Sequence, residues 1–364
     1  MTRVNIFYGS KKKFNEIIPE KYRTLTDVAY ESDRNSKQFY IVVKGEDQKE
    51  TTEERVSIEN FVASSDEYAG VSEHVIINFN NFIAKFKVDN MYLHNPPIQI
   101  SNQVKRLYDE VKINYQNYTQ LKVADLQTIN KEYNSTIIGQ ESVKNELIQA
   151  LFPLTIETRV KPVVILFYGK SGIGKTETAK YISNILEETL FRKQFSMYQN
   201  NQFATYLFGG AHYEKSFAKD MLDRESNVLL LDEFDKAHAS FHSAFYQLFD
   251  EGTYEDQNYN LDLKKSIIIC TSNYSSLNEI EKHLGSAIYN RFDKVIQFSD
   301  LSLESKAQIG EKEYMEISTI YRHSLNNDIK VRLEGSYKYC DNVRQIRHLI
   351  EDTIALDIVS KTLN

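Results

Sequence analysis

A glycine-rich loop near the middle of the chain has the residue types and spacing of a phosphate-binding site. Residues 169–176 read GKSGIGKT and match the pattern GxxxxGK[ST]. Its glycines let successive backbone N–H groups point inward at phosphate oxygens, and the following helix presents its positive end to the same anion. The Lys175 ammonium would reach the terminal phosphates, and the Thr176 hydroxyl would hold Mg²⁺. The other residues expected to bind the nucleotide here are Gly169, Lys170, Ser171, Gly172, Ile173, Gly174 and Glu177.

Two adjacent acids could supply the metal side and the base. Asp232 and Glu233 follow the apolar run Leu229-Leu230-Leu231, so they come at the carboxyl end of a predicted buried strand, where ligands of parallel sheets bind. Asp232 would orient Mg²⁺, and Glu233 would polarise an attacking water as general base. A solvated acidic turn is the alternative, because Asp235 is close by. The phosphate loop upstream favours the catalytic interpretation.

A parallel sheet is needed to bring these residues together. Uninterrupted apolar runs at Val163–Tyr168, Val228–Leu231 and Ser266–Cys270 are typical of strands buried on both faces. Helical patterns lie between them, and this alternation predicts an α/β architecture. Beyond about residue 300 the strand-like runs stop, and the pattern predicts helices such as Asp341–Val359.

The first third of the chain has the pattern of a separate domain. Short β-like runs at Val4–Tyr8, Phe39–Val43 and His74–Phe79 predict an α+β domain over residues 1–101. Residues 102–134 are polar, with apolar residues three and four apart, and are expected to form a helical connector. Residues 135–300 would then form the large nucleotide-binding domain, and residues 301–364 a small C-terminal lid.

Composition excludes several classes of protein. The 364 residues include 44 basic and 51 acidic ones, for a net charge of −7, which argues against a protein that coats nucleic acid. The two cysteines, Cys270 and Cys340, are too few for a disulfide framework and are expected to be buried apolar side chains. No apolar run is long enough to span a membrane, so we expect a cytoplasmic protein without a membrane partner.

The run LLLDEFDKAH (229–238) resembles the Walker B segment of the Clp family of AAA+ ATPases, in particular the second ATPase module of the heat-shock disaggregases. The resemblance covers roughly residues 137–300. It implies an AAA+ P-loop core with a C-terminal helical lid, and ATP as the ligand. Ile137 and Ile138 stand where the family's apolar entry residues flank the adenine. The run SIIICTSN (266–273) resembles the sensor-1 strand, which gives Asn273 the role of positioning the lytic water.

Two arginines gain roles from the same resemblance. Asn290-Arg291-Phe292-Asp293 resembles the arginine-finger segment, in which the arginine enters the neighbouring subunit's site, so the resemblance implies a ring, generally a hexamer. Asn342-Val343-Arg344 resembles the sensor-2 motif, although the family usually has Gly-Ala before this arginine. Arg347, one helical turn further on, is the alternative sensor-2 residue.

Two segments depart from the family. Substrate-threading relatives have a long channel loop with a glycine-flanked aromatic residue, whereas residues 207–216 here are shorter and lack the aromatic–Val–Gly pattern. Tyr213 could grip a substrate or be an ordinary packed or exposed tyrosine. Residues 274–289 lack the Ile-Gly-Leu/Phe loop with which some relatives dock a protease chamber, which argues against a Clp-type protease partner.

Three functions are compatible with these observations. The first is an ATP-driven ring that remodels or disassembles a protein target selected by the N-terminal domain, with the acidic stretch 41–80 as a candidate contact surface. The second is a nucleotide-dependent, oligomerising switch or scaffold in a multi-protein bacterial system, for instance phage defence, that does not thread substrate. The third, a DNA or RNA motor, is disfavoured by the acidic composition and the lack of a basic–aromatic stripe.

Overall fold

The chain folds into two compact units. The computed structural model describes residues 2–38, 55–197, 202–237 and 239–363. Unit 1 contains residues 1–118, 200–225 and 253–262, and unit 2 contains residues 119–199, 226–252 and 263–364. The predicted β-like run Phe39–Val43 and the stretch 41–54 of the acidic segment lie outside the described residues.

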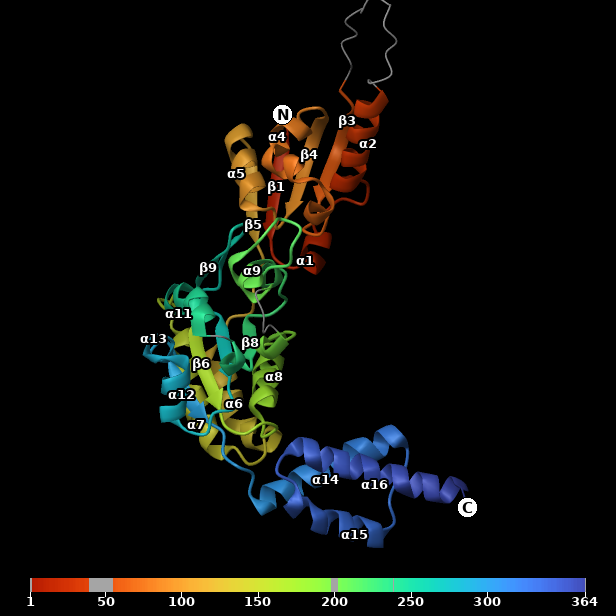
Figure 1. Cartoon of the computed structure of the whole chain (residues 1–364), viewed down its shortest axis with the longest axis vertical. Helices are drawn as coiled ribbons and strands as arrows, with labels where there is room; N and C mark the ends of the chain where they lie inside the picture. Colours follow the sequence, from red (N-terminus) through yellow and green to blue (C-terminus); the bar gives the residue numbers. More distant parts are fainter. Residues whose placement is uncertain (1, 39–54, 198–201, 238, 364) are drawn as a thin grey trace, which may run out of the picture. The chain divides into compact units, whose positions relative to one another are not determined.

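Unit 1 contains a five-stranded parallel sheet of order β2-β3-β4-β1-β5, coloured red to orange in Figure 1. Its strands are β1 (Arg3–Tyr8), β2 (Arg23–Thr24), β3 (Ser57–Ala63), β4 (Lys87–His94) and β5 (Val111–Tyr115). All four neighbouring pairs are parallel, so each connection has to cross over the sheet, and helices make these crossings. The predicted N-terminal domain is therefore a sheet domain, but α+β was the wrong class, because parallel strands joined by helices make it α/β.

The helices of this part of unit 1 correct two further predictions. They are α1 (Lys11–Asn15), α2 (Leu25–Gln38), the 3₁₀ turn η1 (Glu67–Gly70), α3 (Glu73–Ile77), α4 (Phe79–Ile83) and α5 (Ile98–Leu107). Residues 74–79, predicted as a strand from their β-branched side chains, belong instead to helices α3 and α4 and the turn at Asn78 between them. Ile76 and Phe79, three residues apart, are buried, while Ile77 is 55% exposed. The segment 102–134 is not uniformly helical, since it contains β5, which pairs with β1.

Two segments from later in the chain, residues 200–225 and 253–262, complete unit 1, and we call them the first and second excursions. The first leaves after β7 of unit 2 and returns at β8, and the second runs between α11 and β11. Their elements are α9 (Gln202–Phe208), α10 (Phe217–Leu222), β9 (Thr253–Glu255) and β10 (Asn260–Asp262). Strands β9 and β10 pair with each other as an antiparallel hairpin.

Unit 2 is built on a second five-stranded parallel sheet, of order β12-β6-β11-β8-β7. Its strands are β6 (Val163–Tyr168), β7 (Phe191–Gln194), β8 (Val228–Asp232), β11 (Ile267–Thr271) and β12 (Lys294–Gln297). Every residue of β6, β8 and β11 is buried, which confirms the three strands predicted from uninterrupted apolar runs. In the register of the sheet, Cys270 lies between Leu166 and Leu231, so Tyr168, Asp232 and Thr271 end at the same edge.

Helices cover this sheet and continue into the C-terminal lid. The helical elements of the core are α6 (Val123–Thr136), α7 (Glu141–Leu151), η2 (Phe152–Thr155), α8 (Lys175–Ile185), η3 (Phe195–Met197), η4 (Phe234–Lys236), η5 (Ala239–Phe245), α11 (Tyr246–Glu251), α12 (Leu277–Leu284) and α13 (Ser286–Tyr289). Those of the lid are α14 (Leu303–Tyr321), α15 (Asn327–Ser336), η6 (Tyr337–Tyr339) and α16 (Val343–Leu363), so the expected C-terminal helices are confirmed. Within the described residues, the helices lack the combination of length and hydropathy needed to cross a bilayer.

Candidate functional site

The phosphate-binding loop joins β6 directly to α8. Strand β6 ends at Tyr168, and α8 begins at Lys175 with Gly174 as its N-cap. Gly174 has φ +111°, which only glycine adopts without strain. A Cβ on Gly169 would lie 2.4 Å from the backbone oxygen of Phe298, so this position also requires glycine. The loop therefore takes the tight path that aims its backbone at a bound anion.

Lys175 lies inside the loop with its ammonium group bonded to neutral acceptors. Its Nζ donates to the backbone oxygens of Gly169 (2.5 Å) and Lys170 (2.7 Å), and to Oδ1 of Asn273 (3.3 Å). The residue is 7% exposed, and this burial lowers the pKa of Lys175 to about 8. A buried ammonium held by carbonyl and amide oxygens fits a phosphate as its counter-ion. The contact also brings Asn273 to the loop.

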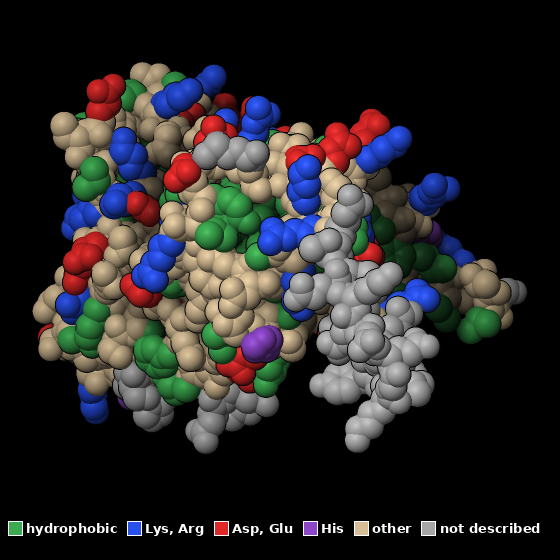
Figure 2. Space-filling model, turned by 90° about the horizontal axis from the view of Figure 1, so that it is seen from above, with side chains coloured by type: hydrophobic (Ala, Val, Ile, Leu, Met, Phe, Trp, Pro, Cys, Tyr) green, Lys and Arg blue, Asp and Glu red, His purple; other side chains and the backbone are tan. Residues whose placement is uncertain are grey.

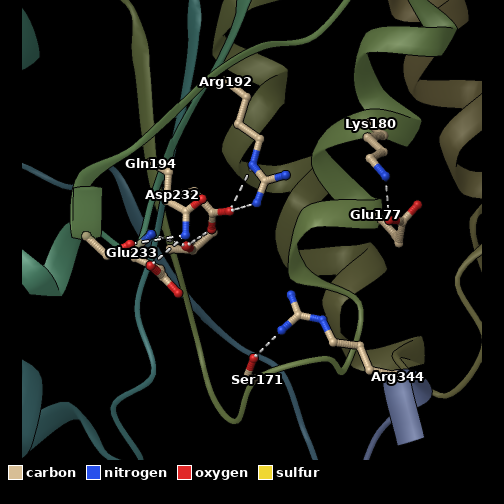
Figure 3. Close-up of polar contacts among 10 residues, drawn as sticks. Ser171, Glu177, Lys180, Arg192, Gln194, Asp232, Glu233 and Arg344 are labelled. Atoms are coloured by element: carbon tan, nitrogen blue, oxygen red, sulfur yellow. Dashed lines mark hydrogen bonds and ion pairs between the residues drawn. The ribbon is translucent and has the colours of Figure 1, made fainter. Parts of the chain in front are cut away.

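Thr271 positions both acids at the end of β8. Its Oγ1 donates to Oδ1 of Asp232 over 2.5 Å and accepts the backbone N–H of Glu233 over 2.9 Å. Glu233 has φ +55°, a left-handed conformation that a non-glycine residue takes at an energetic cost. The other oxygen of the Asp232 carboxylate accepts Nε of Arg192 over 3.0 Å, together with a second hydrogen bond from Nη2 (Figure 3).

The Glu233 carboxylate is ionised and restrained. Gln194 Nε2 donates to Oε2 of Glu233 over 3.0 Å, and this bond is drawn in Figure 3. Hydrogen bonds from Ser196 and Gln194 hold the pKa of Glu233 below its ordinary value. An ionised carboxylate is suited to accept a proton from water, but in this conformation one of its oxygens is already engaged.

Lid helix α16 contacts the loop through Arg344. Its Nη1 donates to Ser171 Oγ over 3.3 Å, and the backbone N–H of Val343 donates to the oxygen of Gly172 over 3.0 Å. The Asn342 side chain lies 3.1 Å from where a Cβ on Gly172 would be, so the asparagine packs against the loop. Arg347 pairs instead with acids of the lid, Glu313 (2.8 Å) and Glu351 (3.3 Å). Between the two candidate sensor-2 arginines, Arg344 is the one hydrogen-bonded to the loop.

These groups line one cleft of about 520 Å³. Its lining residues come from the loop, the strand ends and the lid: Ser171, Gly172, Gly174, Lys175, Thr176, Glu177, Lys180, Arg192, Gln194, Asp232, Glu233, Thr271, Asn273, Glu313, Glu316, Val343, Arg344 and Arg347. The structure thus gathers most of the predicted phosphate, metal and catalytic residues in one place.

Some predicted site residues lie outside this lining. Gly169, Lys170 and Ile173 belong to the loop without lining the cleft, and Lys170 pairs with Asp300 on the surface. Ile137 is buried in the core, with its Cγ2 3.6 Å from the Cβ position of Gly174, and Ile138 packs against the same core. Ile137 therefore lies behind the loop, and neither isoleucine lines the cleft.

Arg291 is also separate from the cleft. Its Nε is 2.9 Å from Oδ2 of Asp250, and its guanidinium lies 4.1 Å from the centre of the Tyr246 ring. The arginine is thus engaged by groups of its own unit, outside the lining of the cleft.

Arg192, Gln194 and Thr271 are functional candidates that were not predicted from the sequence. Arg192 and Gln194 lie on β7, a four-residue edge strand with mixed polar and apolar residues, which is too short for a periodicity signal. The useful signal was their register: Gln194 pairs with Asp232, but that pairing becomes visible only once the strand order is known.

Comparison with known proteins agrees with this geometry. The family model "AAA domain (Cdc48 subfamily)" matches residues 161–335, which include the loop, both acids, Asn273 and Arg291. These residues form an AAA+ ATPase module of the Clp type. The module is similar to the chaperone protein ClpB of Malacoplasma penetrans, with 31% identity over 40% of this chain and 24% of ClpB. It is also similar to the human mitochondrial disaggregase, with 29% identity over 56% of this chain and 30% of that protein.

A solved structure shares the fold of this module. The Saccharomyces cerevisiae Hsp104–ADP complex superposes with a TM-score of 0.52 over 65% of this chain and 49% of that chain, at 21% identity. The matched part of the chain spans under a third of the length of the Malacoplasma penetrans ClpB and of the human mitochondrial disaggregase. AAA+ ATPases bind nucleotide, and this cleft is the candidate site for it in this chain. Its hard oxygen donors, the Thr176 hydroxyl and the Asp232 carboxylate, are of the kind that Mg²⁺ prefers.

Proposed function

We propose that the chain is an ATP-driven remodeller of a protein target, working as a ring, with the N-terminal domain selecting the target. The observation that carries the proposal is the cleft itself. A buried cation (Lys175), an ionised acid (Glu233), a sensor amide (Asn273) and a lid arginine (Arg344) are gathered around one loop. Such a constellation suits phosphoryl transfer to water, in which the protein supplies positioning and charge.

In the proposed reaction, the loop N–H groups and Lys175 bind the phosphates of ATP. Thr176 and Asp232 would hold Mg²⁺, which when bound neutralises developing charge on the phosphates. Glu233 accepts a proton from the attacking water once its carboxylate is free of Gln194, and Asn273 orients that water. Arg344 connects the bound nucleotide to the lid, so that hydrolysis changes how the lid is held.

Arg291 is proposed to act in a neighbouring subunit of a ring, most simply a hexamer. Its position outside the cleft of its own chain is compatible with this role. In the test, Arg291→Ala is expected to cut turnover while nucleotide affinity stays close to wild type. The variant is then mixed with Glu233→Gln, because each protein supplies what the other lacks. Partial recovery of turnover in mixed rings, with ring size measured by mass photometry, would support action in trans, and no recovery at any ratio would contradict it.

The switch or scaffold remains the second proposal, and one observation favours it. The segment in the position of the channel loop belongs to unit 1, where His212 Nε2 is 3.1 Å from the backbone oxygen of Val71. By contrast, Tyr213 in the same segment is 62% exposed and is therefore available to grip a substrate, as the threading function requires. Tyr213→Ala separates the two functions. Target processing that falls while ATPase is retained supports threading, and unchanged processing supports the switch.

A protein target is favoured over nucleic acid. On the face drawn in Figure 2, basic and acidic side chains are interspersed, with no extended field of basic ones. Pull-down with the ATP-trapped Glu233→Gln protein, followed by mass spectrometry, would identify the target. Co-purification of nucleic acid in place of a protein would contradict this part of the proposal. The cytoplasmic location stays a prediction from the sequence.

A further inference from the structure

The two excursions that belong to unit 1 are hydrogen-bonded to its N-terminal part at several places. The Tyr118 hydroxyl, for example, donates to the backbone oxygen of Arg224 over 3.3 Å. Oδ1 of Asp223 accepts the backbone N–H of Lys11 over 2.6 Å, and Asn258 O accepts that of Ile98 over 2.8 Å. A further contact is the bond described above between His212, whose side chain is 7% exposed, and Val71. Since Asp223 and His212 lie on the first excursion and Asn258 on the second, both excursions are held.

Charged side chains of the N-terminal part and of the first excursion lie close together where the two meet. Lys11 pairs with Asp66 over 2.6 Å, and the charge of Asp66 also acts on Lys219 of the first excursion. Burial lowers the pKa of Lys219 and raises that of Asp223, so both side chains are partly desolvated in this contact, although Asp223 stays solvent-exposed. Groups from the N-terminal part and from the excursion therefore alternate in sign, as in a specific interface.

The contacts lie at the carboxyl edge of the N-terminal sheet. Lys11 follows β1, Val71 follows β3 and Ile98 follows β4, each beyond the carboxyl end of its strand. In parallel α/β sheets this edge is where ligands bind. Here the chain's own excursions cover part of it.

The docked segments are continuous with strands of the ATP site. The first excursion follows β7, which carries Arg192 and Gln194, and it leads into β8, which ends at Asp232. The second leads into β11, which ends at Thr271. Restraint of the excursions is thus restraint on the strands that hold Asp232 and Glu233, including the Gln194 bond that occupies the Glu233 carboxylate.

We propose that docking of residues 202–225 and 253–262 on the N-terminal domain restrains ATP turnover, and that undocking releases it. The occupants of the carboxyl edge are the chain's own two excursions, and a protein target that displaces them there would activate the ATPase. The inference rests on the proposed function, because it concerns how that ATPase is regulated. It also assigns the channel-loop position a role in docking rather than in gripping substrate.

The test uses the 364-residue chain with the double substitution His212→Ala/Asp223→Ala, which removes two of these contacts. Glu225→Ala is the matched control, since it removes an exposed acid two residues from Asp223. We expect faster hydrogen exchange in residues 203–222, an increase in kcat of about tenfold and an unchanged nucleotide Kd. The control should match wild type in all three measurements. Asp223→Asn, which keeps an oxygen acceptor for Lys11, should stay close to wild type.

Two results would overturn the proposal. One is faster exchange in the excursion with kcat unchanged or lower, and the other is unchanged exchange in the double variant. If the double variant loses the exchange protection of unit 2, Asp223→Ala alone replaces it, with an expected rise of about threefold in kcat, and no rise would again overturn the proposal. Wild-type protein without any ATP turnover would refute the proposed function itself, whereas normal wild-type turnover with an unresponsive variant refutes only the coupling.

Discussion

The Thr271→Val substitution is a sharp test of how the site is positioned. Valine has nearly the shape of threonine, so the change removes one hydroxyl while the buried volume is kept. That hydroxyl donates to the Asp232 carboxylate over 2.5 Å and accepts the Glu233 N–H over 2.9 Å. Thr271 is 2% exposed and Asp232 7% exposed, so water cannot readily replace either bond.

The expected magnitude follows from these two bonds. A hydrogen bond to a charged group contributes about 1.5–3 kcal/mol, and an unsatisfied buried N–H costs about 1–3 kcal/mol. If about 3 kcal/mol of this loss falls on the transition state, kcat decreases roughly a hundredfold. Thr271→Ser keeps the hydroxyl and loses only a methyl group, so its kcat should stay within about threefold of wild type.

Phosphate release under saturating ATP gives kcat, and titration with a fluorescent ATP analogue gives Kd. We expect Thr271→Val to bind nucleotide, because Lys175 and the glycine loop are untouched. Equal loss of activity in the serine and valine variants would point to packing rather than the hydroxyl. Valine-variant turnover within a few-fold of wild type would refute the positioning role of Thr271.

Three further predictions concern charge. Burial lowers the pKa of Lys175 to about 8, so its ammonium is lost as pH rises. ATP affinity should therefore fall about fivefold from pH 8 to pH 9 in fluorescence titrations, and a flat profile would contradict this. Arg344→Ala should weaken nucleotide binding about tenfold, whereas Arg347→Ala should mainly lower the melting temperature. The reverse pattern would make Arg347 the sensor-2 arginine. His94 is fully buried, and its pKa is lowered from 6.5 to about 4. As pH falls, the unfolded chain binds a proton at His94 before the folded chain does, so unit 1 should lose about 3 kcal/mol of stability between pH 6.5 and pH 4. In urea unfolding, the His94→Gln variant should lack that loss.

The central strands of unit 2 could be predicted from the sequence because the physics there is local. Six consecutive apolar residues, Val163–Tyr168, suit a strand covered on both faces, and the observed β6 has the same bounds. The glycine loop and the acids after β8 were likewise readable, because their spacing is set by the chemistry of phosphate binding. The site roles assigned to these residues remain proposals.

Other features depend on long-range contacts that a sequence does not display. Arg192 and Gln194 lie on a short edge strand, and their importance comes from pairing with β8, whose neighbour could not be known in advance. The run at residues 74–79 has strand-like side chains, yet burial of Ile76 and Phe79 against the N-terminal core favours helix. Membership of the excursions in unit 1 depends on contacts such as Lys11 with Asp223, 212 positions apart in the chain.

The most direct test of the central claim is the Glu233→Gln variant, assayed for phosphate release and nucleotide affinity in parallel with wild type. Glutamine keeps the size and hydrogen-bonding capacity of the side chain but cannot accept the proton from water. The account predicts that the wild-type protein hydrolyses ATP, that kcat is at least about a hundredfold lower in the variant, and that the nucleotide Kd is unchanged. Glu233→Gln protein that hydrolyses ATP at the wild-type rate would contradict it.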